Sequence, residues 1–120
     1  MPMNLSSLSS EIDLETTLDR MCDDHDLLLE ILDLFLAEFT AERANLQAQV
    51  EQGDFANLAT KAHYFKGVAQ NLGLLRFSPQ VKRLEESAKQ NDLVNCQQAV
   101  DELADIARQI LALRQCVQPT

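Results

Sequence analysis

Turn-forming residues are scarce in this chain of 120 residues, which contains three glycines, three prolines and no tryptophan. A fold with many short strands needs such residues at its frequent turns, so their scarcity favours a few long helices. Hydrophobic residues make up 46% of the chain, which is too many for a disordered protein. The length suits a single domain that buries a core of its own.

Cysteines are also few, and Cys22, Cys96 and Cys116 are too many for one disulfide and too few for two. No CxxC spacing occurs, so neither a disulfide framework nor a zinc site is indicated. No apolar run approaches the roughly 20 residues that cross a membrane, and the first ten residues lack the basic and apolar regions of a secretory signal. We expect a cytoplasmic protein with a flexible tail over residues 1–10 and a folded domain over residues 11–117. The starting Met and the short tail favour a free-standing protein.

Positive charge is scarce overall, because the chain has a net charge of −9. Such a charge repels nucleic acid and anionic lipid, and neither is expected as a partner. Six of the ten basic residues nevertheless lie between positions 61 and 89 with only two acids, so this stretch carries +4 and leaves −13 for the rest. Its basic residues are Lys61, Lys66, Arg76, Lys82, Arg83 and Lys89. The cluster suits a docking surface for an acidic partner, and chance clustering explains it equally well from charge alone.

Apolar residues recur at helical spacing along most of the chain. Asp13 and Asp54 have the positions of helix caps, and Gly53 and Gly73 those of left-handed helix terminators. The acidic stretch 23–26 suits the positive end of a helix. Expected are helices near 14–21, through 27–39, around Ala44, Leu46 and Val50, over 55–72, from Ser78 and Pro79 onward, and over 96–113. The predicted fold class is all-α, an antiparallel up-down-up-down four-helix bundle with a short extra N-terminal helix.

The helix predicted over 55–72 has one apolar seam, and His63 lies at its flank, about 100° around the axis from the seam residue Ala62. Lys66, Gly67 and Gln70 follow His63 by three, four and seven residues and so share its face. A glycine inside a helix costs about 1 kcal/mol relative to alanine. Access to the imidazole for a bulky group offsets that cost, and close helix packing is the alternative.

Lys66 places a positive charge beside His63 and is expected to lower the pKa of the imidazole below about 6.5. The neutral ring then has a lone pair for nucleophilic attack. If His63 became phosphorylated, Lys66 would neutralise the added oxygens and Gln70 would donate a hydrogen bond. His63 is therefore the candidate catalytic residue, and Lys66, Gly67 and Gln70 are the candidates for stabilising its phosphoryl group or giving access to it.

The segment AHYFKGVAQNLG over residues 62–73 resembles the signature of histidine-containing phosphotransfer (HPt) domains, in which His is followed by any residue, Leu, Lys, Gly and a spacer ending in Gly. His63, Lys66, Gly67 and Gly73 match it, and Phe65 stands where Leu is usual. Val68 likewise occupies a position where a small residue is common. The preceding GDFANLATKA and the later pair Leu84-Glu85 also resemble the family, and the resemblance covers about residues 11–115.

The resemblance implies a bacterial two-component phosphorelay, in which HPt proteins shuttle a phosphoryl group between aspartates of receiver domains. His63 would be the reversible phosphoacceptor, through its Nε2 atom. An autonomous histidine kinase would need a separate ATP-binding domain, for which 120 residues leave no room, so a carrier without kinase activity of its own is expected. No bound cofactor or metal is expected here, and Mg²⁺ belongs to the receiver's acidic pocket. Glu85 and Lys89 are expected to orient His63 or its phosphoryl group. The candidates for support or docking are Lys61, Gly73, Arg76, Lys82, Arg83, Glu85 and Lys89.

Three other functions compete with a monomeric phosphoryl carrier. The first is an adaptor that docks receiver or kinase domains without transfer, and the second is a bundle whose exposed stripe forms a homodimer. A free-standing enzyme is the third, and no second catalytic group accompanies the histidine. His25 with its acidic neighbours lacks the spacing of a calcium loop, so a solvated helix start is favoured there over a metal site.

Overall fold

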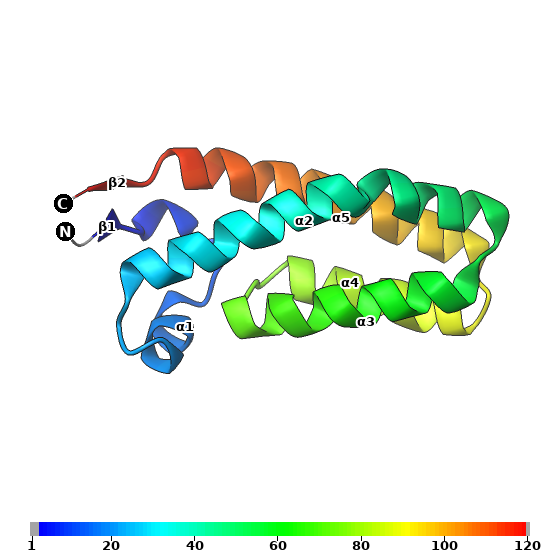
Figure 1. Ribbon diagram of the computed structural model, residues 1–120, viewed down its shortest axis with the longest axis horizontal. Coiled ribbons are helices and arrows are strands. Elements are labelled where there is room, and N and C mark those ends of the chain that lie inside the picture. Colours follow the sequence, from blue (N-terminus) through cyan, green and yellow to red (C-terminus); the bar gives the residue numbers. More distant parts are fainter. Residues whose placement is uncertain (1–2, 120) are drawn as a thin grey trace.

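The helices follow one another with short connections along an elongated molecule of 47 × 23 × 19 Å (Figure 1). The computed structural model describes residues 3–119. Its elements in chain order are β1 (Met3–Asn4), the 3-10 helix η1 (Ser6–Leu8), α1 (Leu14–Arg20), α2 (His25–Gln52), α3 (Phe55–Leu72), α4 (Phe77–Lys89), α5 (Leu93–Gln115) and β2 (Gln118–Pro119). The predicted all-helical bundle is confirmed, with one antiparallel pairing of the two-residue strands β1 and β2 added to it.

The four longer helices pack in a ring of contacts, in which α2 contacts α3, α3 contacts α4, α4 contacts α5 and α5 contacts α2. Figure 1 shows α2 and α5 in one layer above α3 and α4, with α1 at one end. The short strands β1 and β2 pair at that same end. This arrangement leaves one side of α3, the helix that carries His63, open to solvent between α2 and α4.

Four aspartates start the α-helices α1, α2, α3 and α5. The side chains of Asp13, Asp24, Asp54 and Asp92 each accept a hydrogen bond from the backbone N–H three residues further on. These bonds satisfy amides that have no partner within the helix. The predicted caps Asp13 and Asp54 are thus confirmed, and so is Gly53, which follows α2 in the left-handed region.

The predicted division between a helix through 27–39 and a separate helix around Ala44, Leu46 and Val50 is wrong. Helix α2 runs unbroken over His25–Gln52. The span contains no glycine or proline, and the Thr40 hydroxyl donates to the carbonyl of Leu36 within the helix instead of capping a new one. Leu46 and Val50 are buried and continue the apolar face, so burial carries the helix through its polar middle.

Helix α4 begins before the predicted Ser78-Pro79 start. Its first residue is Phe77, and no side chain caps the amides at its N-terminus. Phe77 is fully buried, and the backbone N–H of Ser78 donates to the carbonyl of Leu74. Packing of the Phe77 ring therefore places the start of the helix, and Pro79 sits within the first turn, where its missing N–H costs nothing.

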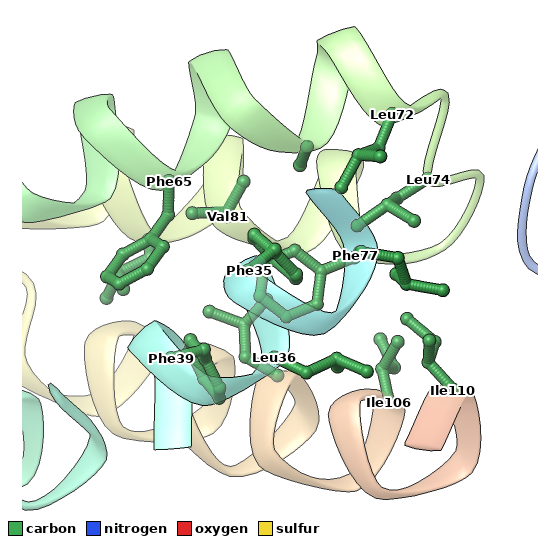
Figure 2. Close-up of a cluster of buried hydrophobic side chains, with 14 of the residues drawn as sticks. Phe35, Leu36, Phe39, Phe65, Leu72, Leu74, Phe77, Val81, Ile106 and Ile110 are labelled. Carbon is green, nitrogen blue, oxygen red and sulfur yellow. The ribbon is translucent and has the colours of Figure 1, made fainter. Parts of the chain in front are cut away.

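Four phenylalanine rings form the centre of the core (Figure 2). Phe35 and Phe39 of α2 each meet Phe65 of α3 and Phe77 of α4 edge to face, with ring centroids 4.9–6.1 Å apart. Such pairs contribute about 0.5–1.5 kcal/mol each beyond their area burial. Because Phe65 belongs to the inward face of α3, the same ring cluster fixes the outward direction of His63 two residues before it.

Residues 3–10 differ from the predicted flexible tail, whose first two residues lie outside the described part of the chain. Leu5 and Leu8 are buried in the core. The Ser7 hydroxyl donates to the carbonyl of Leu113 in α5 at 3.0 Å. Only polar residues separate the two leucines, so the pair formed no recognisable apolar pattern and a flexible tail was predicted.

The segment around α1 forms hydrogen bonds with the C-terminal end of α3, the histidine-bearing helix. The backbone N–H of Asp13 donates to the carbonyl of Gly73, and the buried Thr17 hydroxyl donates to the carbonyl of Leu72. Gly73 has φ +66°, and a Cβ atom there would lie 2.4 Å from Thr17 Oγ1. The glycine that ends α3 is therefore required both by its backbone conformation and by the closeness of α1.

Three further findings bear on the sequence predictions. Cys96 is buried in α5 while Cys22 and Cys116 are exposed, and all three are free thiols. None of the helices within residues 3–119 has the length and apolarity needed to cross a membrane. In the same part of the chain, no three His, Cys, Asp or Glu side chains gather closely enough to hold a metal ion.

Candidate functional site

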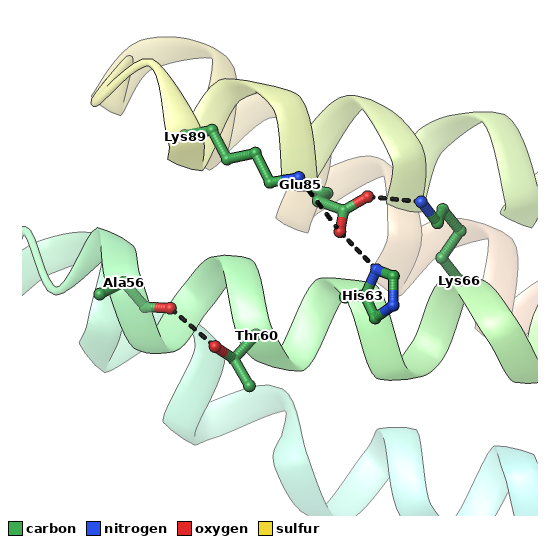
Figure 3. Close-up of polar contacts among 6 residues, drawn as sticks. All are labelled: Ala56, Thr60, His63, Lys66, Glu85 and Lys89. Atoms are coloured by element: carbon green, nitrogen blue, oxygen red, sulfur yellow. Dashed lines mark hydrogen bonds and ion pairs between the residues drawn. The ribbon is translucent and has the colours of Figure 1, made fainter.

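His63 projects from the middle of α3, with 71% of its side chain exposed. Its helix neighbours Ala62 and Phe65 are buried, as the apolar seam predicted. One ring nitrogen, Nδ1, lies 2.7 Å from Oε2 of Glu85, which comes from α4 (Figure 3). The other ring nitrogen, Nε2, faces away from Glu85. The imidazole is thus held at one nitrogen and open at the other.

Glu85 is a buried carboxylate at the centre of a polar cluster, only 4% exposed. Its Oε1 accepts a hydrogen bond from Lys66 Nζ at 2.6 Å, and Lys89 Nζ lies 3.7 Å from its Oε2. The hydrogen bond from Lys66 lowers the pKa of Glu85 below its ordinary value of 4.5. Burial opposes this effect, and the hydrogen bond from His63 and the charges of Lys66 and Lys89 add to it. The Glu85 carboxyl is therefore ionised at neutral pH.

An ionised carboxylate only accepts hydrogen bonds, so the proton between Glu85 and His63 belongs to Nδ1. In a neutral imidazole the other nitrogen, Nε2, then holds the lone pair. The contact with Glu85 thus selects the tautomer whose lone pair is on Nε2, the ring nitrogen that faces away from Glu85. The same arrangement stabilises a positive charge that develops on the ring.

Gly67 lies one turn beyond His63 on the exposed face of α3. A Cβ atom built there meets nothing within 4 Å. Close helix packing therefore does not account for this glycine, which was the alternative left open by the sequence. The exposed face of α3 therefore has open space one turn beyond the imidazole.

A cleft of about 280 Å³ runs between α3 and α4 next to the imidazole. It is lined by Ala59, Thr60, His63, Glu85 and Lys89. The Thr60 hydroxyl donates to the carbonyl of Ala56 within the helix at 3.1 Å (Figure 3). Ala59 and Thr60 were not among the predicted site residues, although their spacing of four and three residues before His63 indicates that they share its face.

A second groove, of about 460 Å³, lies between α2 and α3 on the other side of the histidine-bearing helix. Tyr64, the residue after His63, donates its hydroxyl to Glu38 of α2 at 2.6 Å. This hydrogen bond raises the pKa of Tyr64 above its ordinary value of 10.0. Tyr64 is a half-exposed aromatic residue beside the imidazole. It was not among the predicted site residues, because its position lies off the apolar seam.

The remaining predicted site residues do not join the cluster around His63. Gln70 is exposed, and its backbone carbonyl accepts a hydrogen bond from Arg20. Gly73 terminates α3. Three of the basic residues are bound elsewhere: Lys61 pairs with Glu42 of α2, Arg76 pairs with Glu11, and Arg83 is bonded to Asn95 and Gln98 of α5. Lys82 is exposed, and its side chain has no such partner within residues 3–119.

The basic stretch is therefore not one continuous docking face. Its cations bind groups on α2, the N-terminal segment and α5 as well as Glu85, and three carboxylates, Glu11, Glu42 and Glu85, offset part of their charge. Of the predicted supporting residues, Glu85 and Lys89 are the two that the fold brings to His63. Lys66 also lies there, but its ammonium group is bound to Glu85 rather than free beside the imidazole.

Comparison with known proteins agrees with this geometry. A protein-family model described as the Hpt domain matches residues 30–116, which include His63, Lys66 and Glu85. Neither the curated proteins nor the solved structures give a match. The match covers well over half of the chain, and the chain therefore belongs to the Hpt domain family, a domain that acts as a phosphocarrier in signalling.

Proposed function

We propose that this chain is a phosphorelay intermediate that accepts a phosphoryl group on Nε2 of His63 from the aspartate of one receiver domain and passes it to another. The observation that carries the proposal is the pairing of His63 Nδ1 with the ionised Glu85. That contact leaves the Nε2 lone pair exposed, beside the space at Gly67.

The chemical step balances with the residues in place. The Nε2 lone pair attacks the phosphorus of the aspartyl phosphate, an Nε2–P bond forms, and the P–O bond to the aspartate breaks with its electrons on the departing carboxylate. Because Nδ1 keeps its proton, the imidazole ring becomes positively charged, and the Glu85 carboxylate stabilises that charge. Reversal of the same step returns the phosphoryl group to a receiver aspartate.

The receiver supplies the acidic pocket and the divalent metal ion, which neutralises charge on the phosphoryl oxygens during transfer. This chain contributes a positioned imidazole and a surface that the receiver docks on. The exposed Tyr64, the open position at Gly67 and the two grooves beside His63 support docking on this side of α3. We assign the exchange to the cytoplasm of a bacterial two-component system, on the strength of the family.

We also propose that the four longer helices run antiparallel in up-down-up-down order, within a domain that includes residues 11–117 and works as a monomer. Connections of only a few residues between consecutive helices support that order. So does the contact of each longer helix with the next one in the chain. The burial of Leu5 and Leu8 extends the domain toward the N-terminus.

The proposal is tested by following labelled phosphate from phosphorylated receiver domains onto the purified protein, alongside His63→Gln and His25→Gln. These are the two histidines of the chain, so the second variant is a matched control. Acid-labile label on the wild type and on His25→Gln, and none on His63→Gln, is the expected result. If no receiver in a broad panel transfers label, the adaptor without chemistry replaces the carrier, and light scattering then tests the homodimer.

A further inference from the structure

Two lysines share the one buried carboxylate beside His63, and they hold it differently. Lys66 Nζ lies 2.6 Å from Oε1 of Glu85, and only 22% of the Lys66 side chain is exposed. Lys89 Nζ lies 3.7 Å from Oε2, and 63% of the Lys89 side chain is exposed. Oε2 already accepts the hydrogen bond from His63. Lys66 therefore forms the tight contact, and Lys89 forms a loose one on an oxygen that has another partner.

The charges of the cluster do not cancel before phosphorylation. Two ammonium groups face one carboxylate, which leaves the cluster with an excess of one positive charge. A phosphoryl group brings about −1.5 to −2 charges at neutral pH and three strong acceptor oxygens. One lysine is thus available for it, provided that the other stays with Glu85.

Lys66 is the lysine that stays with Glu85. Its departure would leave a buried carboxylate oxygen without its closest donor, and an unpaired buried charge is strongly unfavourable. The departure of Lys89 would break only a long, solvent-exposed ion pair, a kind of contact that contributes little to stability. The geometry thus indicates that Lys66 is the structural lysine and Lys89 the mobile one.

Lys89 also has the room and the reach to move. It lines the same cleft of about 280 Å³ as His63, and besides His63 the helix α3 contributes only the small side chains of Ala59 and Thr60 to that cleft. The Lys89 ammonium and the His63 Nδ1 contact the same Glu85 oxygen, so they are no more than 6.4 Å apart, the sum of the two distances. Nε2 lies on the other side of the ring, so the exposed Lys89 side chain has to swing past the imidazole to meet a phosphoryl oxygen there. Figure 3 shows the Lys89 side chain extended along α4 toward this oxygen.

We propose that Lys89, rather than Lys66, supplies the ammonium group that binds the phosphoryl oxygens on His63, while Lys66 keeps Glu85 in place to hold the imidazole. The inference rests on the proposed function, because it requires a phosphoryl group on His63. On phosphorylation, Lys89 Nζ leaves Glu85 Oε2 and donates to a phosphoryl oxygen. Lys66 is then a positioning residue, and its substitution acts through Glu85.

The experiment needs no receiver domain. Phosphoramidate phosphorylates histidine directly: the Nε2 lone pair forms the N–P bond, the P–N bond of the reagent breaks, and ammonia leaves. The second ionisation of the phosphoryl group on His63 is then followed by phosphorus NMR as a function of pH. The proteins compared are the wild type, Lys89→Gln, Lys89→Arg, Lys66→Gln and Lys82→Gln. Lys82 is on the same helix, is exposed and does not line the cleft, so its variant measures the effect of one charge lost outside the cleft.

An ammonium group next to the phosphoryl oxygens lowers their pKa. Lys89→Gln is expected to raise that pKa by about half a unit, less at high salt, while Lys89→Arg keeps the wild-type value and Lys82→Gln shifts it by much less. Lys66→Gln is expected to lower the proportion of phosphate on Nε2 relative to Nδ1. As a second readout, acylation of the Lys89 amine in the wild type is expected to slow once His63 is phosphorylated.

The inference is overturned if Lys89→Gln and Lys82→Gln give the same phosphoryl pKa, or if Lys66→Gln alone raises it. Unchanged acylation of Lys89 after phosphorylation overturns it without any variant. A wild-type protein that takes no phosphoryl group from phosphoramidate overturns it as well. A protein that is loaded by phosphoramidate but never by a receiver refutes only the proposed function and leaves the Lys89 result standing.

Discussion

Replacement of Glu85 by alanine should slow phosphorylation of His63 while the fold is retained. The carboxylate accepts the Nδ1 proton at 2.7 Å, selects the tautomer with the free Nε2 and stabilises the positive charge that forms on the ring during attack. A hydrogen bond to a charged group contributes about 1.5–3 kcal/mol. If that contribution is lost from the transition state, the rate falls by about 10- to 150-fold.

The assay is the rate of His63 phosphorylation by phosphoramidate, measured for wild type, Glu85→Ala, Glu85→Gln and Glu86→Ala. Glutamine offers a neutral acceptor of similar shape and should give an intermediate rate. Glu86 is adjacent, exposed and has the same charge, so Glu86→Ala corrects for the change in net charge. Helical circular dichroism confirms that each variant is folded, and nitrogen NMR of the imidazole reports the tautomer. A Glu85→Ala rate within twofold of the Glu86→Ala rate would refute the positioning role.

Three further predictions follow from particular residues. Gly67→Ala should raise the free energy of unfolding by up to about 1 kcal/mol, because a Cβ there meets nothing within 4 Å. The same change should slow phosphoryl transfer from a receiver but not from phosphoramidate, and equal effects on the two rates would contradict the docking role. Leu8→Ala should lower the free energy of unfolding in urea by about 2–5 kcal/mol, because Leu8 is fully buried; no change would mean that this segment frays. The pKa of Glu85 is lower in the folded protein, so the unfolded chain binds the Glu85 proton more readily. The stability that its ion pairs contribute is therefore present above pH 4.5 and is lost as the pH falls through the folded-state pKa. The difference in the free energy of unfolding in urea between wild type and Glu85→Gln should shrink in that acid range, and a constant difference would contradict this prediction.

Most of the histidine-bearing helix was predictable from sequence because its determinants are local. Asp54 caps α3 and Gly73 ends it, and both act through backbone groups only a few residues away. The apolar seam likewise set which face is buried. The exposure of His63 and Gly67 followed from one helical period, without knowledge of the partner helices.

The environment of His63 was less predictable because it depends on another helix. Glu85 is 22 residues from His63 in the chain. Because it stands next to Glu86, the sequence alone indicates an ordinary exposed carboxylate. The family resemblance suggested that it orients His63, but periodicity gave no means of knowing that α4 buries it between Lys66 and the imidazole. The basic stretch was predicted to form one surface for the same reason, because the sequence does not show which cations pair with groups on other helices.

The predictions for the N-terminal segment and for α2 were wrong for a related reason. Leu5 and Leu8 are buried by α5 and its neighbours rather than by a periodic pattern of their own. The middle of α2 has a polar composition that predicted a break, but burial of Leu46 and Val50 further along keeps the helix intact. In both places tertiary packing outweighs local preference.

The central claim, a phosphoryl group carried on Nε2 of His63, is tested most directly by phosphorus NMR of the protein after incubation with a phosphorylated receiver domain. The account predicts one phosphohistidine resonance, assigned to Nε2 by its coupling to the ring protons, in the wild type and in His25→Gln but not in His63→Gln. A resonance from Nδ1-phosphohistidine, or any phosphohistidine that persists in His63→Gln, would contradict it.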